Sequence, residues 1–181
     1  MIGQGKTARK IQSMPDALPR PEPFAPQATP AALEDLPRVG TVLALAAGDE
    51  AYAWYGTGPG ETYPDRARSG QLGLWQSTVS EQLVPYVRPQ ENGGHAGVRW
   101  AQVGAVRIDL DKPRQVSALH VTAADLDTAT HDDEVVARPE TFITIDAAHR
   151  GVGTASCGPD TLPQYLVPTG SHTWTWTLSS R

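Results

Sequence analysis

Apolar and polar residues alternate with a period of two along most of this chain. The clearest case is the set Val106, Ile108 and Leu110, which alternates with charged residues at 107, 109 and 111. Successive side chains of a strand point to opposite faces, so this period is typical of a strand with one buried face. The same period predicts strands at 42–46, 52–54, 116–121, 141–145 and 171–178, with the strongest signal in the last.

Three of the five tryptophans (Trp54, Trp75 and Trp100) fall in one stretch that also contains two turn clusters, at 56–60 and 89–94. Glycine supplies positive φ angles, and proline fixes φ and donates no N–H, so both clusters are expected to be shaped loops. The stretch therefore predicts strand, loop, strand, loop, strand.

One helix is expected. Thr122 and Asp125 have the spacing of a capping box, and 126–130 could form two turns after them. Many strands, closely spaced turns and a single short helix predict an all-β protein, an antiparallel β-sandwich.

Residues 1–38 have a different composition from the rest. Seven prolines fall between Pro15 and Pro37, and no hydrophobic period appears. Such a segment buries too little to offset its ordering entropy, so we expect a disordered or extended arm at 1–38 and a folded domain at 39–181. The sequence Gly5-Lys6-Thr7 looks like the end of a phosphate-binding loop, but the earlier glycine and the preceding strand of that motif are missing.

Net charge, cysteine content and the lengths of the apolar runs argue against several classes of function. The net charge is −5 and the basic residues are scattered, which argues against a nucleic-acid partner. The single cysteine excludes an intrachain disulfide and suits a reducing compartment. No apolar run is long enough for a membrane span, and no apolar core follows the basic residues near the N-terminus. A soluble, cytoplasmic protein is expected, without a membrane or nucleic-acid partner.

Two features suggest chemistry but have simpler explanations. The acidic run 125–134, which includes His131, lacks the turn glycine of a calcium loop, so we expect a solvated acidic helix end and no metal site. Cys157 would need a histidine or a helix N-terminus nearby to act as a nucleophile. His149 is close in sequence, but a small packing residue in a loop is the better interpretation.

The carboxylates Glu61, Asp65 and Glu91 lie in the two shaped loops. Glycosidases need two carboxyl groups that face each other across the scissile bond, about 5–10 Å apart, and a sequence does not show such a distance. Arg66 lies in the same loop as Glu61 and Asp65, and an arginine beside carboxylates more often forms an ion pair that holds loops together. We therefore predict a structural framework of Glu61, Asp65, Arg66 and Glu91, and no catalytic residue.

Several motifs, in their order and spacing over roughly residues 31–178, are similar to those of a known protein family. These motifs are Trp54-Tyr55-Gly56, Gly58-Pro59-Gly60-Glu61, Tyr63-Pro64-Asp65-Arg66, Pro85-Tyr86-Val87, Pro89-Gln90-Glu91-Asn92-Gly93, Arg99-Trp100, and Asp146 to Gly153 running into Ser156-Cys157-Gly158-Pro159-Asp160. Together they resemble the C-terminal domain of bacterial β-galactosidases of the LacZ type, glycoside hydrolase family 2.

The resemblance implies a galactose mutarotase-like supersandwich, of which this chain would be the C-terminal half. The enzymes of the family hydrolyse terminal β-D-galactosides such as lactose, using two glutamates of a barrel domain, with magnesium and sodium assisting. This chain is too short for a barrel and lacks its strand–helix alternation. We therefore expect a fragment that supports and edges the active site, is inactive alone, holds no cofactor itself, and meets its substrate only together with the rest of a β-galactosidase chain or subunit.

The resemblance also gives Cys157 a role. It stands where many family members have a tryptophan that stacks on the substrate, so it is the expected substrate-binding residue. A cysteine can line an apolar subsite but offers no aromatic face to a sugar.

Two other functions stay open. The chain could be a non-catalytic carbohydrate-binding or assembly module, or a mutarotase-like enzyme that uses His120, His149 and Glu140. Half a sandwich should also expose its apolar inner face, which would make the isolated chain poorly soluble.

Overall fold

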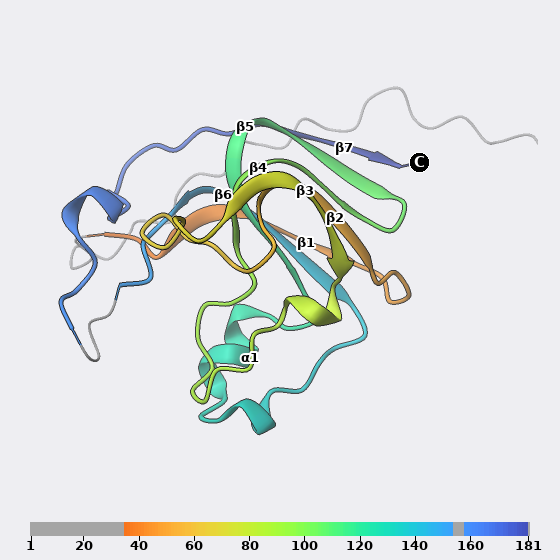
Figure 1. The fold of residues 1–181 in the computed structure, drawn as a ribbon, viewed down its shortest axis with the longest axis horizontal. Helices are drawn as coiled ribbons and strands as arrows, with labels where there is room; N and C mark the ends of the chain where they lie inside the picture. Colours follow the sequence, from red (N-terminus) through yellow and green to blue (C-terminus); the bar gives the residue numbers. More distant parts are fainter. Residues whose placement is uncertain (1–34, 154–157, 181) are drawn as a thin grey trace, which may run out of the picture. The chain divides into compact units, whose positions relative to one another are not determined.

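The computed structural model describes residues 35–153 and 158–180 (Figure 1). The elements in chain order are β1 (Arg38–Leu45), β2 (Ala51–Gly58), β3 (Gln71–Thr78), the 3₁₀ turn η1 (Ser80–Gln82), β4 (His95–Val103), β5 (Val106–Leu119), helix α1 (Ala123–Thr128), η2 (Asp132–Glu134), β6 (Thr141–His149), η3 (Pro163–Tyr165) and β7 (Trp176–Ser180). Within this part of the chain, no helix is long and apolar enough to cross a lipid bilayer.

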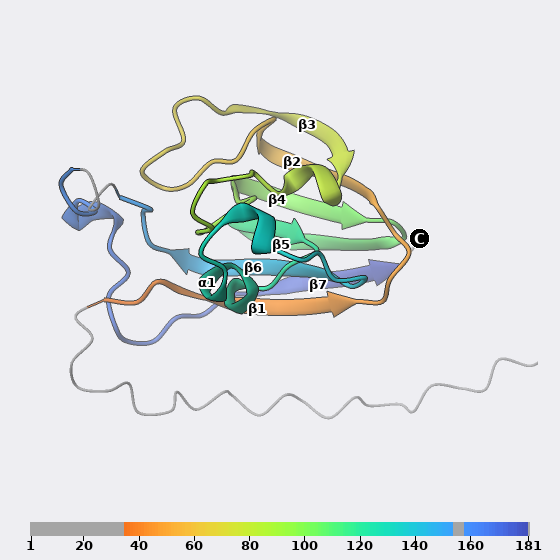
Figure 2. The same ribbon diagram turned by 90° about the horizontal axis from the view of Figure 1, so that it is seen from below.

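The strands form a seven-stranded sheet (Figure 2). Six of them follow the order β1-β6-β5-β4-β2-β3, and the seventh, β7, pairs with β5. All of the pairings are antiparallel. The predicted class is therefore confirmed: the protein is all-β and antiparallel, as expected for a β-sandwich. The further prediction, that this sheet is the C-terminal half of a larger supersandwich, stays a prediction.

The strand β5 joins two strands that the hydrophobic pattern predicts separately. It continues through Pro113 without a break. The part of β5 before Pro113 pairs with β7, and the part after Pro113 pairs with β6. The ladder to β7 ends at Leu110, and the ladder to β6 begins at Gln115. Pro113 lies between the two ladders, so its missing N–H removes no hydrogen bond with β6 or β7.

The ends of two other elements also differ from the prediction. The strand expected at 171–178 begins only at Trp176, and Trp174 instead donates its indole N–H to the hydroxyl of Thr41 in β1 at 3.2 Å. Helix α1 begins as predicted: Thr122 is its N-cap and forms a reciprocal capping box with Asp125. It ends at Thr128, two residues earlier than expected.

One face of the sheet is closed over a core. Tyr52, Trp54, Ile108, Ile143 and Ile145 are each no more than 1% exposed. Most of this inner face is thus buried, contrary to the expectation, but Leu178, which the register places beside Ile108, is 52% exposed. The strands curve around the core (Figure 1), and partly buried side chains of β1, β3, β5 and β7 pack against it: Leu43, Leu45, Trp75, Leu110 and Trp176.

The structure covers only the end of the predicted arm. Residues 1–34, including Gly5-Lys6-Thr7, lie outside the described residues, so the arm remains a prediction. Asp35 is already attached to the domain, because it forms a β-bridge with Pro168 and its carboxylate lies 2.6 Å from Nε of Arg150. The first strand begins at Arg38, the last residue of the predicted arm.

The close approach of β2 and β4 depends on Gly56. A Cβ atom at this position would lie 2.8 Å from the Cα of Val98. We expect Gly56→Ala to lower the free energy of unfolding by about 1–3 kcal/mol, because the backbone must move to accept the methyl group. Urea denaturation measures this change. Gly60→Ala is the control, because nothing lies within 4 Å of its added Cβ, and equal stabilities of the two variants would contradict the prediction.

Candidate functional site

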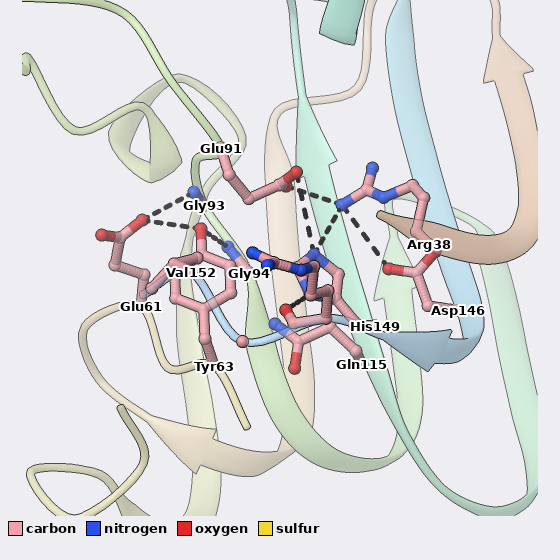
Figure 3. Close-up of polar contacts among 12 residues, drawn as sticks. Arg38, Glu61, Tyr63, Glu91, Gly93, Gly94, Gln115, Asp146, His149 and Val152 are labelled. Carbon is pink, nitrogen blue, oxygen red and sulfur yellow. Dashed lines mark hydrogen bonds and ion pairs between the residues drawn. The ribbon is translucent and has the colours of Figure 1, made fainter. Parts of the chain in front are cut away.

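A buried carboxylate, that of Glu61, joins the loop after β2 to the loop before β4 (Figure 3). Its side chain is 8% exposed. One oxygen accepts hydrogen bonds from Arg66 and from the hydroxyl of Tyr86. The other accepts from the hydroxyl of Tyr63 at 3.0 Å and from the backbone N–H of Gly93 at 2.9 Å. Burying a charge is costly unless it is paired and hydrogen-bonded, and these four donors meet that requirement.

A second carboxylate of the same loop, that of Asp65, holds the segment that follows β6. Its two oxygens accept the backbone N–H groups of Val152 at 3.0 Å and Gly153 at 2.8 Å. The approach is close, because a Cβ on Gly151 would lie 2.6 Å from the carboxylate. Gly153 has φ +61°, a conformation that favours glycine. Asp65 therefore fixes the backbone just before residues 154–157.

The third carboxylate, that of Glu91, belongs to a cluster between β1 and β6. The guanidinium of Arg38 lies 2.6 Å from Glu91, 2.9 Å from Nε2 of His149 and 3.6 Å from Asp146 (Figure 3). The sheet register places Arg38 directly opposite His149. Nδ1 of His149 donates to the carbonyl of Arg150 at 2.6 Å, so Nε2 is the acceptor for Arg38.

The two carboxylates of this cluster differ in their pKa values. Burial alone would raise the pKa of Glu91, but the positive charge and the hydrogen bond of Arg38 help to outweigh it, and the pKa is lowered. Burial dominates at Asp146 and raises its pKa to about 6, although the charge of Arg38 opposes the shift. Among the described residues, Oδ1 of Asp146 has no hydrogen-bond partner.

A cavity of about 260 Å³ lies beside this network. It is lined by Pro37, Tyr63, Arg66, Gln90, Glu91, His149, Arg150, Gly151 and Val152. A glycosidase needs a carboxylic acid with a raised pKa that can protonate the leaving oxygen. Glu91 has a lowered pKa, and Asp146, whose pKa is raised, has a side chain that is only 2% exposed. The arrangement therefore joins loops but does not present an acid–base pair to a ligand.

The structure brings the four predicted framework residues into the contacts described above. Arg66 pairs with Glu61, Asp65 holds the segment after β6, and Glu91 pairs with Arg38. Their collective role as a framework for a distant active site stays a prediction. Cys157 lies outside the described residues, so its expected role also stays a prediction.

Sequence reasoning missed two members of the network, Arg38 and Asp146. A signal for Asp146 exists, because it is a charged residue that directly follows the apolar alternation of 141–145. For Arg38 there is no such signal, since its partner Glu91 is 53 residues away.

The residues considered for a mutarotase-like enzyme lie in different clusters. Nε2 of His120 lies 2.7 Å from the carboxylate of Glu50, and its Nδ1 donates to the backbone carbonyl of Glu140 at 2.8 Å. His149 belongs instead to the cluster of Arg38. His120 thus contacts Glu140 only through the backbone.

The acidic run has a structural role at its first residue. Asp125 caps α1 and pairs with Arg138 at 2.6 Å, and the Arg138 hydrogen bond is the main cause of its lowered pKa. Residues 35–153 and 158–180 contain no group of three or more His, Cys, Asp or Glu side chains that could hold a metal ion. The expectation that this chain holds no magnesium or sodium itself stays a prediction.

Comparisons with known proteins match nearly the whole chain. A profile of the family described as "Beta galactosidase small chain" matches residues 11–178. The chain is 39% identical to a β-galactosidase of Vibrio cholerae over 136 residues, which are 75% of this chain and 13% of the relative. It is 34% identical to a β-galactosidase of an Arthrobacter species over 141 residues (72% and 14%) and to one of Kluyveromyces lactis over 137 residues (74% and 13%). The chain thus spans about one seventh of the length of these relatives.

The buried carboxylate of Glu61 provides a test of the loop network. In Glu61→Gln the amide cannot accept all four hydrogen bonds, and Arg66 loses its partner. We expect a loss of about 2–4 kcal/mol in the free energy of unfolding, measured by urea denaturation. Asp133→Asn, at an exposed position of η2, should change it by less than about 0.5 kcal/mol. A Glu61→Gln variant as stable as that control would show that the network contributes little.

The raised pKa of Asp146 predicts a pH dependence. Its pKa rises from 3.8 to about 6 on folding, so between these values the folded state binds more protons and stability falls as the pH rises. Asp146→Asn removes this dependence. The free energy of unfolding of the variant minus that of the wild type should therefore increase by about 2 kcal/mol between pH 4 and pH 7. Urea denaturation across this range measures the difference, and a difference independent of pH would contradict the assignment.

Proposed function

The chain belongs to the β-galactosidase small-chain family, and we propose that it is a non-catalytic part of a β-galactosidase that supports the substrate site of the larger enzyme. The relatives that it matches are named β-galactosidases, and it spans about one seventh of their length. In this proposal the hydrolysis of terminal β-D-galactosides is carried out by residues of the rest of the enzyme.

The proposal rests mainly on the two hydrogen bonds between the Asp65 carboxylate and the backbone of the segment after β6. The carboxylate accepts the N–H groups of Val152 and Gly153, directly before the segment that contains Cys157. From the resemblance, Cys157 is the residue that we expect to contact the substrate. A fixed backbone at the base of this segment is what a supporting role requires, because a small displacement of a substrate-contacting group lowers the rate substantially.

The other framework residues act on the position of Asp65. Glu61 and Arg66 pair within the loop that contains Asp65, and Glu61 also holds Gly93 of the neighbouring loop. Glu91 and Arg38 pair close to His149, at the end of β6, from which the segment of Val152 departs. Three loops are thereby held together at one end of the sheet.

Catalysis by the chain alone is not expected from these groups. Retaining glycosidases use a nucleophilic carboxylate and a second carboxyl group that acts as acid and then as base. Glu61 is occupied by four donors, and Glu91 is held by Arg38 with a lowered pKa. Neither is free to attack a sugar carbon or to protonate a leaving oxygen.

The test combines this chain with a truncated relative. The Vibrio cholerae β-galactosidase would be produced without the region that matches this chain, and hydrolysis of a chromogenic β-galactoside would be measured. We expect no hydrolysis by either part alone and hydrolysis by the mixture. Hydrolysis by this chain alone, or a mixture that stays inactive and shows no binding, would contradict the proposal.

A direct galactose-binding measurement separates this proposal from a carbohydrate-binding module. Isothermal titration calorimetry of the chain alone should show no galactose binding, because the expected site needs the larger enzyme. Binding without hydrolysis would favour the module.

A further inference from the structure

The outer face of the sheet has an exposed apolar surface that the core does not use. The strand register places Leu74 of β3, Tyr55 of β2 and Trp100 of β4 side by side in one row across the sheet. Leu74 is 61% exposed, and Leu72, two residues earlier on the same strand, is 55% exposed. The inner face of the same strands is already buried, so the fold does not require these outer side chains to be apolar.

Two arginines lie over the aromatic rings of this surface. The guanidinium carbon of Arg99 is 5.5 Å from the centre of the Tyr55 ring, and that of Arg107 is 4.1 Å from the Trp100 ring. Arg107 also pairs with Asp109, whereas Arg99 is exposed and makes no ion pair within the described residues. We call these residues the outer patch: Tyr55, Leu72, Leu74, Arg99, Trp100 and Arg107. Tyrosine, tryptophan and arginine are the residues enriched where proteins bind one another.

The charge of the outer patch favours a different protein over a second copy of this chain. In a symmetric dimer the same patch meets itself, which brings Arg99 towards the Arg99 of the other copy, whereas the charge of Arg107 is already paired with Asp109. Like charges at an interface oppose association. A complementary surface is therefore apolar and acidic, and belongs to another polypeptide.

The similarity to β-galactosidases suggests which polypeptide would provide the complementary surface. The relatives contain about 86% of their length outside the matched region. We propose that the outer patch binds the rest of a β-galactosidase polypeptide through an apolar and acidic surface of that partner. This inference rests on the proposed function, since it names the partner-binding face of the same protein.

The experiment compares the binding of two variants of this chain to the truncated Vibrio cholerae β-galactosidase. Leu74→Glu places a charge in the outer patch, at a residue that is 61% exposed, and Val136→Glu makes a similar change at a residue that is 76% exposed elsewhere. Isothermal titration calorimetry measures the Kd for the truncated Vibrio cholerae β-galactosidase. We expect Leu74→Glu to weaken binding by at least about tenfold and Val136→Glu to leave it unchanged. Thermal unfolding of each variant alone shows that both are folded.

A charge reversal tests the acidic character of the partner. Arg99→Glu should weaken binding, and the loss should be smaller at high ionic strength because salt screens the repulsion. Arg68→Glu, at an exposed arginine in another loop, is its control.

The outcomes separate this inference from the proposed function. If Leu74→Glu binds and restores hydrolysis as the wild type does, the outer patch is not the interface, although the proposed function stands. If the wild-type chain does not bind at all, both fail. If the chain alone forms a dimer that Leu74→Glu dissociates, the patch binds a second copy and the inference is overturned.

Discussion

The carboxylate of Glu61 is the constraint on which the loop end of the sheet depends. A charged group with 8% exposure is stable only if its oxygens find donors within the protein. Its donors come from two loops far apart in sequence: Tyr63 and Arg66 from one, Tyr86 and Gly93 from the other. The two loops must therefore keep one relative position, and this fixes Asp65, which lies in the first loop.

The two faces of the sheet have different roles. The inner face is closed around Trp54 and Ile108 by the curvature of the strands and by side chains of β1, β3, β5 and β7. Most of this face is buried, but the closure ends at β7, where Leu178 lies beside Ile108 in the register and is 52% exposed. The exposed apolar residues Leu72 and Leu74 lie on the opposite face, which is the surface that we propose for association.

The residues that identify the family are not those expected to do its chemistry. The sequence around Glu61 and Glu91 carries the resemblance, yet both carboxylates are paired with arginines. Such pairs hold loops in place. This is consistent with a supporting role for the chain, since a part that only positions neighbouring groups needs a rigid framework more than a reactive one.

Much of the fold was predictable from local patterns. The alternation at 106–111 and 141–145 predicted strands, and the capping box of Thr122 predicted the start of α1, because these signals depend only on residues close in sequence. The pattern failed at Pro113, which looks like a break but lies between two ladders of one long strand. It failed again at 171–175, which forms no strand although Thr175 accepts a backbone hydrogen bond from Asp111, and where the indole of Trp174 contacts β1.

For the candidate site, the sequence determined the residue types, and the tertiary structure decided their partners. Arginine beside carboxylates in one loop predicted the pair of Arg66 and Glu61, because both partners lie five residues apart. The pairs of Arg38 with Glu91 and of Asp65 with Gly153 join residues 53 and 88 positions apart. No local pattern specifies such contacts, because they arise only when the sheet register brings distant loops to the same edge.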